Sequence, residues 1–378
     1  MSKKRIMLIS SLAGSLLNFR GDFICSLVTN DFEVFCAAPD FDKETIHQLS
    51  LLKAHSILVP LSRTGLNPFA DLKSILVIKK IIEKYAIDVV FPYTIKPVVY
   101  GSIAAHLSKK PAISLITGLG YTFSGVSTRA KLLQNITRLL YQLALRNNKA
   151  VVFQNEDDYL LFVKKRIVSK QQPFYIVNGS GVNLNRFKYR TYKKHCGPVS
   201  FIIIARLIEE KGTGLYLEAA KTLIKKFPET IFHIVGSPPK NNSSGTLIDN
   251  LNRLTQEGII VYHGAQPNVV DFLSNSDVFV LPTYYREGIP RSILEALSVG
   301  MPVITTLTPG CKETVENMEN GILIPPKDLE ALINAMEFFV KNPESIQKMG
   351  QKSREIAEQK FDVNKINQQL ITIINSHI

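Results

Sequence analysis

The residues from 284 to 295, YYREGIPRSILE, have the most informative spacing in the chain. They follow an apolar run typical of a buried strand and open an apolar helix, for which Pro290 suits the first position. Gly288–Ile289 would leave backbone N–H groups open before that helix, where anions such as phosphate bind. Glu287 and Glu295 are carboxylates that can accept hydrogen bonds from hydroxyls. Together these features indicate a nucleotide-sugar site, whereas each alone fits a capped helix with solvated glutamates.

Two cations follow an earlier strand-like run, Phe201–Ile204. Arg206 would lie at the carboxyl end of that strand, and Lys211 would begin the next helix. Arginine offers a planar fork of donors and lysine a compact charge. The pair could therefore neutralise a diphosphate and the charge that grows on it as a glycosyl bond breaks. The alternative is a surface arginine paired with Glu209 or Glu210.

Two further strand ends carry candidate donor-binding residues. Gly236 ends one strand, where a glycine lets a ligand approach the backbone closely, although a plain turn would also use it. His263 follows the next strand, where a hydrogen-bonded structural histidine is the alternative to a ligand contact.

Apolar, β-rich runs alternate with helical patterns along the whole chain, which predicts parallel sheets covered on both faces. At 378 residues the chain is long for one core, and a polar, aperiodic stretch at 186–197 is the best linker. Expected helices include 17–29, 69–85, 98–107 and 128–145. The expected strands are 6–10, 33–37, 56–59, 88–91, 112–116, 150–153 and 175–177, then 199–204, 230–235, 259–262, 278–281, 303–305 and 321–324.

These patterns predict an α/β protein of two doubly wound, Rossmann-like domains, residues 1–188 and 189–361. Two such domains in succession imply a cleft, with ligands at the carboxyl ends of the strands. The absence of G-x-G-x-x-G after the first strand argues against a dinucleotide cofactor.

Charge is distributed unevenly along the chain. Residues 1–188 carry 25 lysines and arginines against 12 acids, whereas 189–378 carry 20 of each, so the net charge of +13 lies in the first half. That excess favours an anionic partner, such as lipid headgroups, a diphosphate or nucleic acid, over a merely solubilising surface. The four cysteines are scattered without metal spacing, which fits reduced, mostly buried thiols in a cytosol. No apolar run approaches the roughly 18 to 20 residues that span a bilayer.

The E-x7-E element from Glu287 to Glu295, preceded by R-x-x-x-x-K-G at 206–212, resembles the GT4-type family of retaining glycosyltransferases with the GT-B fold. The resemblance implies that Glu295 holds ribose hydroxyls and Glu287 the sugar hydroxyls. It further implies that the C-terminal helix, 362–378, packs back on the first domain. The remaining implied donor-site residues hold the diphosphate (Gly288, Ile289, Pro290), stabilise the leaving nucleotide (Arg206, Lys211) and line the donor site (Gly236, His263).

Loops of the first half resemble a subgroup that adds N-acetylhexosamines to polyprenyl-diphosphate-linked sugars. The loop at 117–125 has three glycines, two aromatic residues and no charge, which suits stacking on a sugar or contact with lipid. It lacks the histidine that many GT4-type enzymes carry there, so the resemblance names no acid–base group for the acceptor. The implied acceptor-side residues are Gly14, Ser15, Arg63, Asn67, Lys96, Gly118 and Tyr121.

The resemblance thus implies a retaining transferase that moves a sugar, an N-acetylhexosamine from a UDP-sugar, onto a polyprenyl-diphosphate-linked saccharide in bacterial surface polysaccharide or glycan biosynthesis. No metal or other cofactor is expected, and no nucleic acid. The protein would be cytoplasmic and bound peripherally to the anionic surface of the inner membrane on its cytoplasmic face. Basic residues that could contact this surface are Lys109, Lys110, Arg129, Lys131 and Arg138.

Three alternatives stay open. A UDP-sugar 2-epimerase on the same architecture would need acidic and histidine groups around the sugar, of which the first-half loops offer few. A metal-dependent GT-A transferase needs D-x-D, and the triplet from Asp40 to Asp42 more readily caps a helix. A non-catalytic nucleotide-sugar or nucleic-acid binder is the third, although the chain has no recognised RNA or DNA module.

Overall fold

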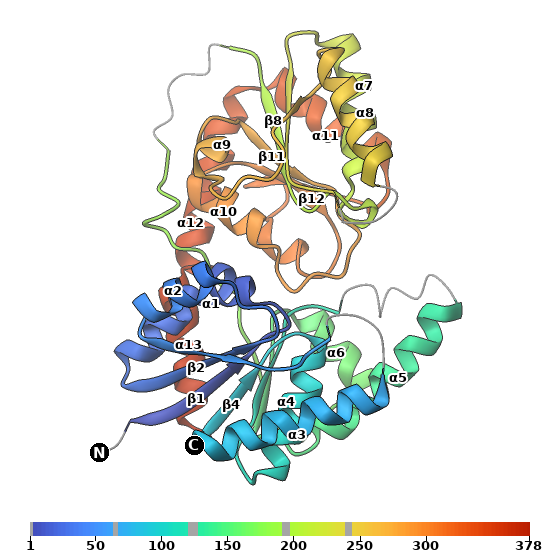
Figure 1. Cartoon of the computed structure of the whole chain (residues 1–378). Helices are drawn as coiled ribbons and strands as arrows, with labels where there is room; N and C mark the ends of the chain where they lie inside the picture. The colour runs from blue at the N-terminus through green and yellow to red at the C-terminus, as the bar shows by residue number, and fades with distance from the viewer. Residues whose placement is uncertain (1–2, 63–66, 120–127, 191–196, 239–243) are drawn as a thin grey trace. The chain divides into compact units, whose positions relative to one another are not determined.

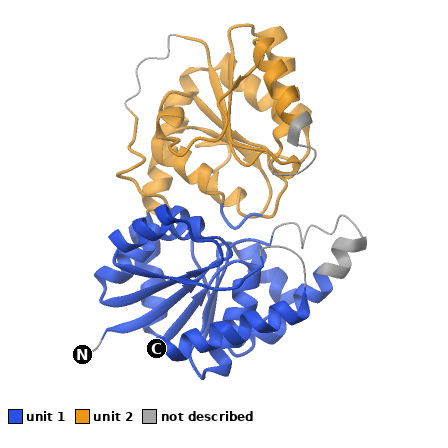
Figure 2. Ribbon diagram, viewed as in Figure 1, with its two compact units in different colours: residues 1–181, 287–289, 363–378 blue, residues 182–286, 290–362 orange. Residues whose placement is uncertain are grey.

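A computed structural model describes residues 3–62, 67–119, 128–190, 197–238 and 244–378. They form two compact units (Figure 2). Unit 1 comprises residues 1–181, 287–289 and 363–378, and unit 2 comprises 182–286 and 290–362.

The change from unit 1 to unit 2 falls at Gly181 and Val182, seven residues before the boundary that we predicted at 188 and 189. Residues 182–188 belong to unit 2 because they bond to it at both ends. The backbone N–H of Val182 donates to the carbonyl of Phe361 at 2.8 Å. The carbonyl of Phe187 accepts from the Ser298 hydroxyl at 2.6 Å.

The strands of unit 1 are all parallel. β1 (Lys4–Ile9), β2 (Phe32–Ala38), β3 (Ala54–Leu58) and β4 (Val89–Pro92) pair in the order β3-β2-β1-β4, and β5 (Ile113–Ile116), β6 (Ala150–Phe153) and β7 (Phe174–Ile176) follow. Isolated parallel bridges, Val90–Ala112 and Tyr93–Leu115, join β4 to β5. The strand order therefore reverses between β1 and β4, where ligands bind in doubly wound folds.

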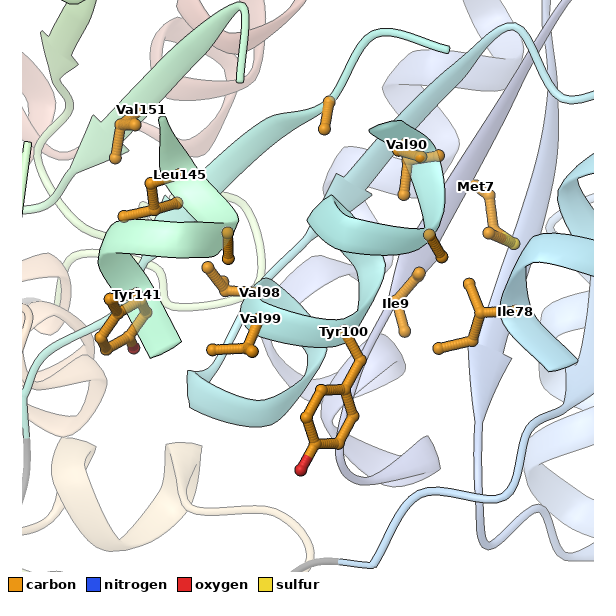
Figure 3. Packing of buried hydrophobic residues seen from close by; sticks show 14 of the residues in the cluster. Met7, Ile9, Ile78, Val90, Val98, Val99, Tyr100, Tyr141, Leu145 and Val151 are labelled. Atoms are coloured by element: carbon orange, nitrogen blue, oxygen red, sulfur yellow. The ribbon is translucent and has the colours of Figure 1, made fainter. Parts of the chain in front are cut away.

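Helices cover both faces of this sheet (Figure 1). One face carries α1 (Ala13–Thr29), α2 (Lys43–Leu51) and α13 (Val363–Asn375), and the other α3 (Pro68–Lys84), α4 (Ile95–Leu107), α5 (Thr128–Leu145) and α6 (Glu156–Lys164). Figure 3 shows the second layer, where helix residues such as Ile78, Val98 and Leu145 pack with Met7 and Val151 of the strands.

The C-terminal helix α13 belongs to unit 1 because its apolar stripe is buried there. Ile366, Leu370 and Ile374, spaced four residues apart, join the core cluster that contains Leu16 and Phe23 of α1. This burial supplies the interaction that keeps the last helix with the first unit rather than the second.

Unit 2 is a second, fully parallel sheet. Its strands are β8 (Ser200–Ile204), β9 (Ile231–Val235), β10 (Val261–Tyr262), β11 (Val278–Leu281), β12 (Val303–Thr306) and β13 (Gly321–Ile324), in the order β10-β9-β8-β11-β12-β13. This is the Rossmann order, with its reversal between β8 and β11. Its helices are α7 (Thr213–Lys226), α8 (Ser244–Gln256), α9 (Val270–Ser274), α10 (Arg291–Val299), α11 (Leu329–Lys341) and α12 (Glu344–Lys360), with short 3₁₀ helices η2 (Glu209–Lys211) and η3 (Lys312–Thr314).

Every predicted strand corresponds to an observed strand with ends shifted by at most two residues, so the α/β alternation is confirmed. The three described cysteines are free, and two of them, Cys36 and Cys311, are buried, as predicted for most of the thiols. Cys25 is exposed on α1, and Cys196 lies outside the described residues. Within the described ranges, no helix has the length and apolar character that crossing a membrane requires.

Candidate active site

Two loops are tied together at the strand-order reversal of unit 2. One follows β8 and the other follows β11. The carbonyl of Glu210 accepts hydrogen bonds from the backbone N–H of Tyr284 at 2.9 Å, that of Tyr285 at 3.2 Å and the Thr283 hydroxyl at 2.9 Å. The Tyr284 hydroxyl also donates to Glu209 Oε1 at 3.1 Å. One carbonyl therefore fixes the segment that carries Arg206 and Lys211 against the start of the other predicted site segment.

Gly212 sets the position of Lys211. Its φ of 77° is in the left-handed region, and a Cβ there would collide with the carbonyl oxygen of Pro282. Only glycine fits this turn without strain. We had predicted that Lys211 begins the next helix. It instead ends η2, because α7 starts two residues later at Thr213. The Lys211 Nζ lies 5.8 Å from the centroid of the Tyr285 ring.

Arg206 is exposed just beyond β8. Among the described residues it makes no ion pair, so the alternative pairing with Glu209 or Glu210 is not observed. Glu209 instead receives the Tyr284 hydroxyl. A cation at the carboxyl end of a central strand that makes no ion pair in the described structure is suited to an anionic ligand.

The helix expected to bind phosphate begins one residue later than predicted. The backbone of Pro290 is still extended, with φ −65° and ψ 118°. Pro290 is therefore the N-cap of α10, and Arg291 is the first helical residue. The carbonyl of Pro290 accepts from the N–H groups of Ile293 at 3.1 Å and Leu294 at 3.4 Å. Within the described structure, neither Gly288 nor Ile289 donates its N–H to a protein acceptor, as an anion site requires.

The segment Glu287–Ile289 belongs by its contacts to unit 1. There, Asn155 Nδ2 donates to the carbonyl oxygens of Glu287 at 3.3 Å and Gly288 at 3.0 Å. Asn155 was not among the predicted residues. These bonds use the carbonyl groups of the segment and leave the opposite, N–H side of its peptides for other partners.

Glu295 is nearly buried, with 12% of its side chain exposed, and pairs with Arg291 through Nε and Oε1 at 2.9 Å. Burial raises the pKa of the Glu295 carboxyl above its ordinary value, and the charges of Arg291 and Arg186 oppose that rise. We did not predict Arg291, although an acid and a base four residues apart on a helix are a recognisable signal.

The other two donor-side candidates have structural partners. Gly236 has φ 151°, and a Cβ there would collide with the carbonyl oxygen of Ala205, so the neighbouring strand end alone explains the glycine. His263 Nε2 lies 3.1 Å from His233 Nδ1. Burial lowers the pKa of both histidines, and the charge of His263 lowers that of His233 further. The geometry therefore favours a neutral histidine pair.

Gly14 and Ser15 lie in the first turn of α1, which begins at Ala13, four residues before the helix that we predicted from residue 17. The Ser15 hydroxyl bonds to Ser10 Oγ at 2.6 Å and to the Tyr93 hydroxyl at 2.9 Å. Burial raises the pKa of Tyr93 to about 12, which keeps its proton available for hydrogen bonding. This network joins the ends of β1 and β4, where the strand order of unit 1 reverses.

Lys96 forms a second polar cluster beside this network. Its Nζ lies 3.6 Å from Asp71 Oδ1, with 13% and 16% of the two side chains exposed. Within the described structure this buried ammonium has no hydrogen-bond partner. Burial and a hydrogen bond with Asp71 raise the pKa of Tyr100. Two residues before the lysine, Thr94 has φ 68°, a left-handed conformation that is strained for a β-branched residue.

The remaining acceptor-side candidates are dispersed. Asn67 is the N-cap of α3, since its side-chain oxygen accepts from the Ala70 N–H at 3.2 Å. Gly118 is half-buried after β5, with φ 103°. Arg63 and Tyr121 lie outside the described residues.

The carboxylates of the D-x-D triplet act as helix caps, as we expected. Asp42 accepts from the Thr45 N–H at 2.6 Å at the start of α2, and Asp40 accepts from the Ala13 N–H at 2.7 Å at the start of α1. The described side chains contain no group of three or more histidines, cysteines or acids that could hold a metal ion.

Two parallel Rossmann-like units in succession define the GT-B fold. Residues 185–356 match the glycosyl transferases group 1 family and residues 5–155 match the glycosyl transferase 4-like family, so the chain belongs to the group 1, GT4-type glycosyltransferases.

Two relatives and one solved structure illustrate the similarity. The N,N'-diacetylbacillosaminyl-diphospho-undecaprenol alpha-1,3-N-acetylgalactosaminyltransferase of Campylobacter jejuni is 26% identical over 98% of both chains. The UDP-Gal:alpha-D-GlcNAc-diphosphoundecaprenol alpha-1,3-galactosyltransferase of Escherichia coli is 27% identical over 74% of this chain and 73% of its own. The fold matches Anabaena HepE in complex with UDP at a TM-score of 0.78, with 17% identity over 99% of this chain and 100% of that one.

Proposed function

We propose that this enzyme transfers an N-acetylhexosamine from a UDP-sugar to a saccharide linked to a polyprenyl diphosphate, with retention of the anomeric configuration. The names of the two relatives support the acceptor class, because both contain a sugar joined to undecaprenol through a diphosphate. The first also transfers an N-acetylhexosamine, and its similarity covers 98% of this chain. The resulting product class belongs to bacterial surface polysaccharide or glycan biosynthesis.

The observation that carries the donor side is the tie between the two loops of unit 2 through Glu210. It fixes Lys211 and brings it, with the exposed Arg206, to the strand-order reversal where doubly wound folds bind nucleotides. Glu295 follows on α10, where its carboxylate can receive two hydroxyls of a ribose. The fold shared with a UDP complex supports UDP as the nucleotide.

In the proposed reaction, the bond between the sugar C1 and the diphosphate oxygen breaks as the acceptor oxygen bonds to C1 from the same face. The acceptor proton passes to the departing phosphate oxygen, so no protein base is needed. Arg206 and Lys211 stabilise the negative charge that develops on UDP, and the open N–H groups of Gly288 and Ile289 hold its phosphates. Glu287 orients the sugar hydroxyls. In this proposal these groups stabilise the charge and orient the sugar without a metal ion or another cofactor.

On the acceptor side, Lys96 is suited to the diphosphate of the lipid-linked saccharide. Its ammonium is held by Asp71 yet lacks a hydrogen-bond partner, and it follows the strained Thr94 at the carboxyl edge of the unit 1 sheet. A phosphate oxygen would supply the missing acceptor. The hydroxyls of Ser11 and Thr94, 3.1 Å apart, offer donors nearby.

An acceptor with a polyprenyl chain lies in a membrane, so we propose that the protein works peripherally on its cytoplasmic face. The five basic residues that we named for this contact do not form one exposed group. Lys110 pairs with Asp88 at 3.5 Å, and the Arg138 Nε is buried. The side chains of Arg129 and Lys131 lie outside the described structure. If the excess positive charge of residues 1–188 contacts a membrane, it must do so through a surface other than these five residues.

The test is to incubate the purified protein with a panel of UDP-sugars and a polyprenyl-diphosphate-linked saccharide, and to measure lipid product and released UDP. Transfer from a UDP-N-acetylhexosamine with an α-linkage in the product, seen by nuclear magnetic resonance, is the expected result. Conversion of the UDP-sugar to its 2-epimer without acceptor would overturn the proposal in favour of the epimerase. Nucleotide binding without transfer to any acceptor of this class would favour the non-catalytic binder.

A further inference from the structure

Helix α3 exposes a row of large apolar side chains. Phe69, Leu72 and Leu76 are 88%, 56% and 46% exposed. Their spacing of three and four residues places them on one side of the helix. The opposite side is buried in the core through Ile78 and Ile82. No part of the described structure covers the exposed row, which would be costly to leave in water on a protein that acts alone in solution.

Lysines accompany this row. Lys73, Lys80 and Lys84 are exposed on the same helix. The one exposed acid of the helix, Glu83, is paired with Lys79. An apolar row flanked by cations is the arrangement that binds an anionic lipid surface, where the apolar side chains enter the boundary and the lysines meet headgroups.

A second row on α5 repeats the pattern. Ile136, Leu139 and Leu143 are 37%, 52% and 55% exposed, again three and four residues apart. Helix α4 lies between α3 and α5 in the same layer, and all three cover one face of the unit 1 sheet (Figure 1). Both apolar rows therefore point away from that sheet on the same side.

The α3 row is linked to the proposed acceptor site through one residue. Asp71, next to Leu72 in the sequence, points inward and holds Lys96 at 3.6 Å. The first turns of α3 thus present Phe69 and Leu72 outward and position Lys96 inward. A membrane bound at this end of the helix would lie beside the lysine suited to a lipid-linked diphosphate.

We infer that the outer surface formed by α3 and α5 seats the protein on an anionic bilayer. This inference rests on the proposed function only for the identity of the lipid-linked acceptor. Charge complementarity favours a bilayer over a second copy of the chain, since two lysine-flanked copies of this surface would repel one another.

The experiment compares the unchanged protein with a variant that combines Phe69→Ser, Leu72→Ser and Leu76→Ser. Both are sedimented with vesicles of phosphatidylglycerol and phosphatidylethanolamine, and with neutral phosphatidylcholine vesicles. We expect the unchanged protein to bind the anionic vesicles, less so as salt rises, and the triple variant to bind at least ten times more weakly. A double variant, Leu51→Ser with Leu58→Ser, is the matched control: its leucines are 62% and 68% exposed elsewhere on unit 1, and it should bind like the unchanged protein.

Transfer assays separate this inference from the proposed function. The triple variant should retain UDP binding and transfer to an acceptor in detergent, yet lose transfer to the same acceptor embedded in vesicles. Vesicle binding that depends on α3, without transfer in any assay, would support the membrane-binding surface and contradict the proposed acceptor. Equal vesicle binding by the unchanged and triple-variant proteins would overturn the inference. So would a dimer, seen by light scattering, that the triple variant breaks while neither protein binds vesicles.

Discussion

Arg291 and Glu295 form an ion pair 2.9 Å long across one turn of α10, in a position where only 17% and 12% of their side chains are exposed. The pair orients a carboxylate that burial would otherwise favour in its neutral form. In the proposed donor site, the Glu295 carboxylate would therefore meet the nucleotide with its direction already fixed and its charge already supported, which would lower the ordering that binding requires.

We predict that Glu295→Ala weakens UDP binding by roughly 10- to 100-fold. The lost groups are two hydrogen bonds to a charged acceptor, each worth about 1.5–3 kcal/mol, and part of that loss is recovered by water. Isothermal titration with UDP measures the change. Glu319→Ala, which removes an exposed acid from the same unit, should leave binding unchanged. Equal affinity in both variants would contradict the assignment of the ribose contact.

We also predict a pH dependence of UDP binding. The carboxylate of Glu295 accepts hydroxyl hydrogen bonds in its charged form, so its contribution is complete above its pKa and lost as the pH falls through it. Because burial raises that pKa, the loss begins above the pH of about 4.3 typical of glutamate. Comparing the unchanged protein with Glu295→Gln at each pH removes the titration of UDP itself. The ratio of their affinities should shrink toward low pH, and a constant ratio would count against this role.

Arg206→Ala should slow turnover on the order of 10²-fold and affect UDP binding less, because the charge that Arg206 meets is greatest in the transition state. Steady-state kinetics with the donor at saturation measures this effect. Arg206→Lys should restore part of the rate, since it keeps the charge without the fork of donors. Arg253→Ala, at an exposed arginine of α8, is the control. Unchanged turnover in Arg206→Ala would contradict the assignment of Arg206 to the catalytic site.

Gly212→Ala should destabilise the protein by more than about 1 kcal/mol, because alanine is strained in the left-handed region and its Cβ meets Pro282. Thermal unfolding followed by circular dichroism measures the loss, and turnover should fall with it as Lys211 is displaced. Gly214→Ala is the control two residues on. It lies in α7 with open space at its Cβ position and should be neutral or stabilising by up to about 1 kcal/mol.

Activity should survive EDTA, because in the proposed reaction Arg206, Lys211 and the N–H groups before α10 supply the charge neutralisation that a divalent ion supplies elsewhere. The variant Asp42→Asn tests the competing D-x-D site without breaking the fold, since asparagine also caps a helix well. It should keep full activity. A rate abolished by EDTA, restored by manganese and sensitive to Asp42→Asn would establish the metal-dependent alternative.

Much of this architecture could be predicted from the sequence because buried parallel strands are continuous apolar runs. That signal located the strands, and with them the loops after β8 and β11. The local details depended on interactions that no run reveals. The backbone of Pro290 stays extended, which moved the helix start to Arg291. The carbonyl of Glu210 has no side-chain signature, and the left-handed Thr94 contradicts the preference of its residue type.

The hydrogen bonds to Glu210 have a consequence for engineering and for evolution. Two backbone N–H groups and one hydroxyl of the loop after β11 meet one backbone carbonyl in the loop after β8, so a loop that is exchanged alone keeps these bonds only where its backbone follows the same path. A chimera that takes only one of them from a relative should fold poorly or bind donor weakly, whereas a chimera that takes both should keep its donor site. For the proposed donor site, these two separate stretches of sequence would then be inherited together.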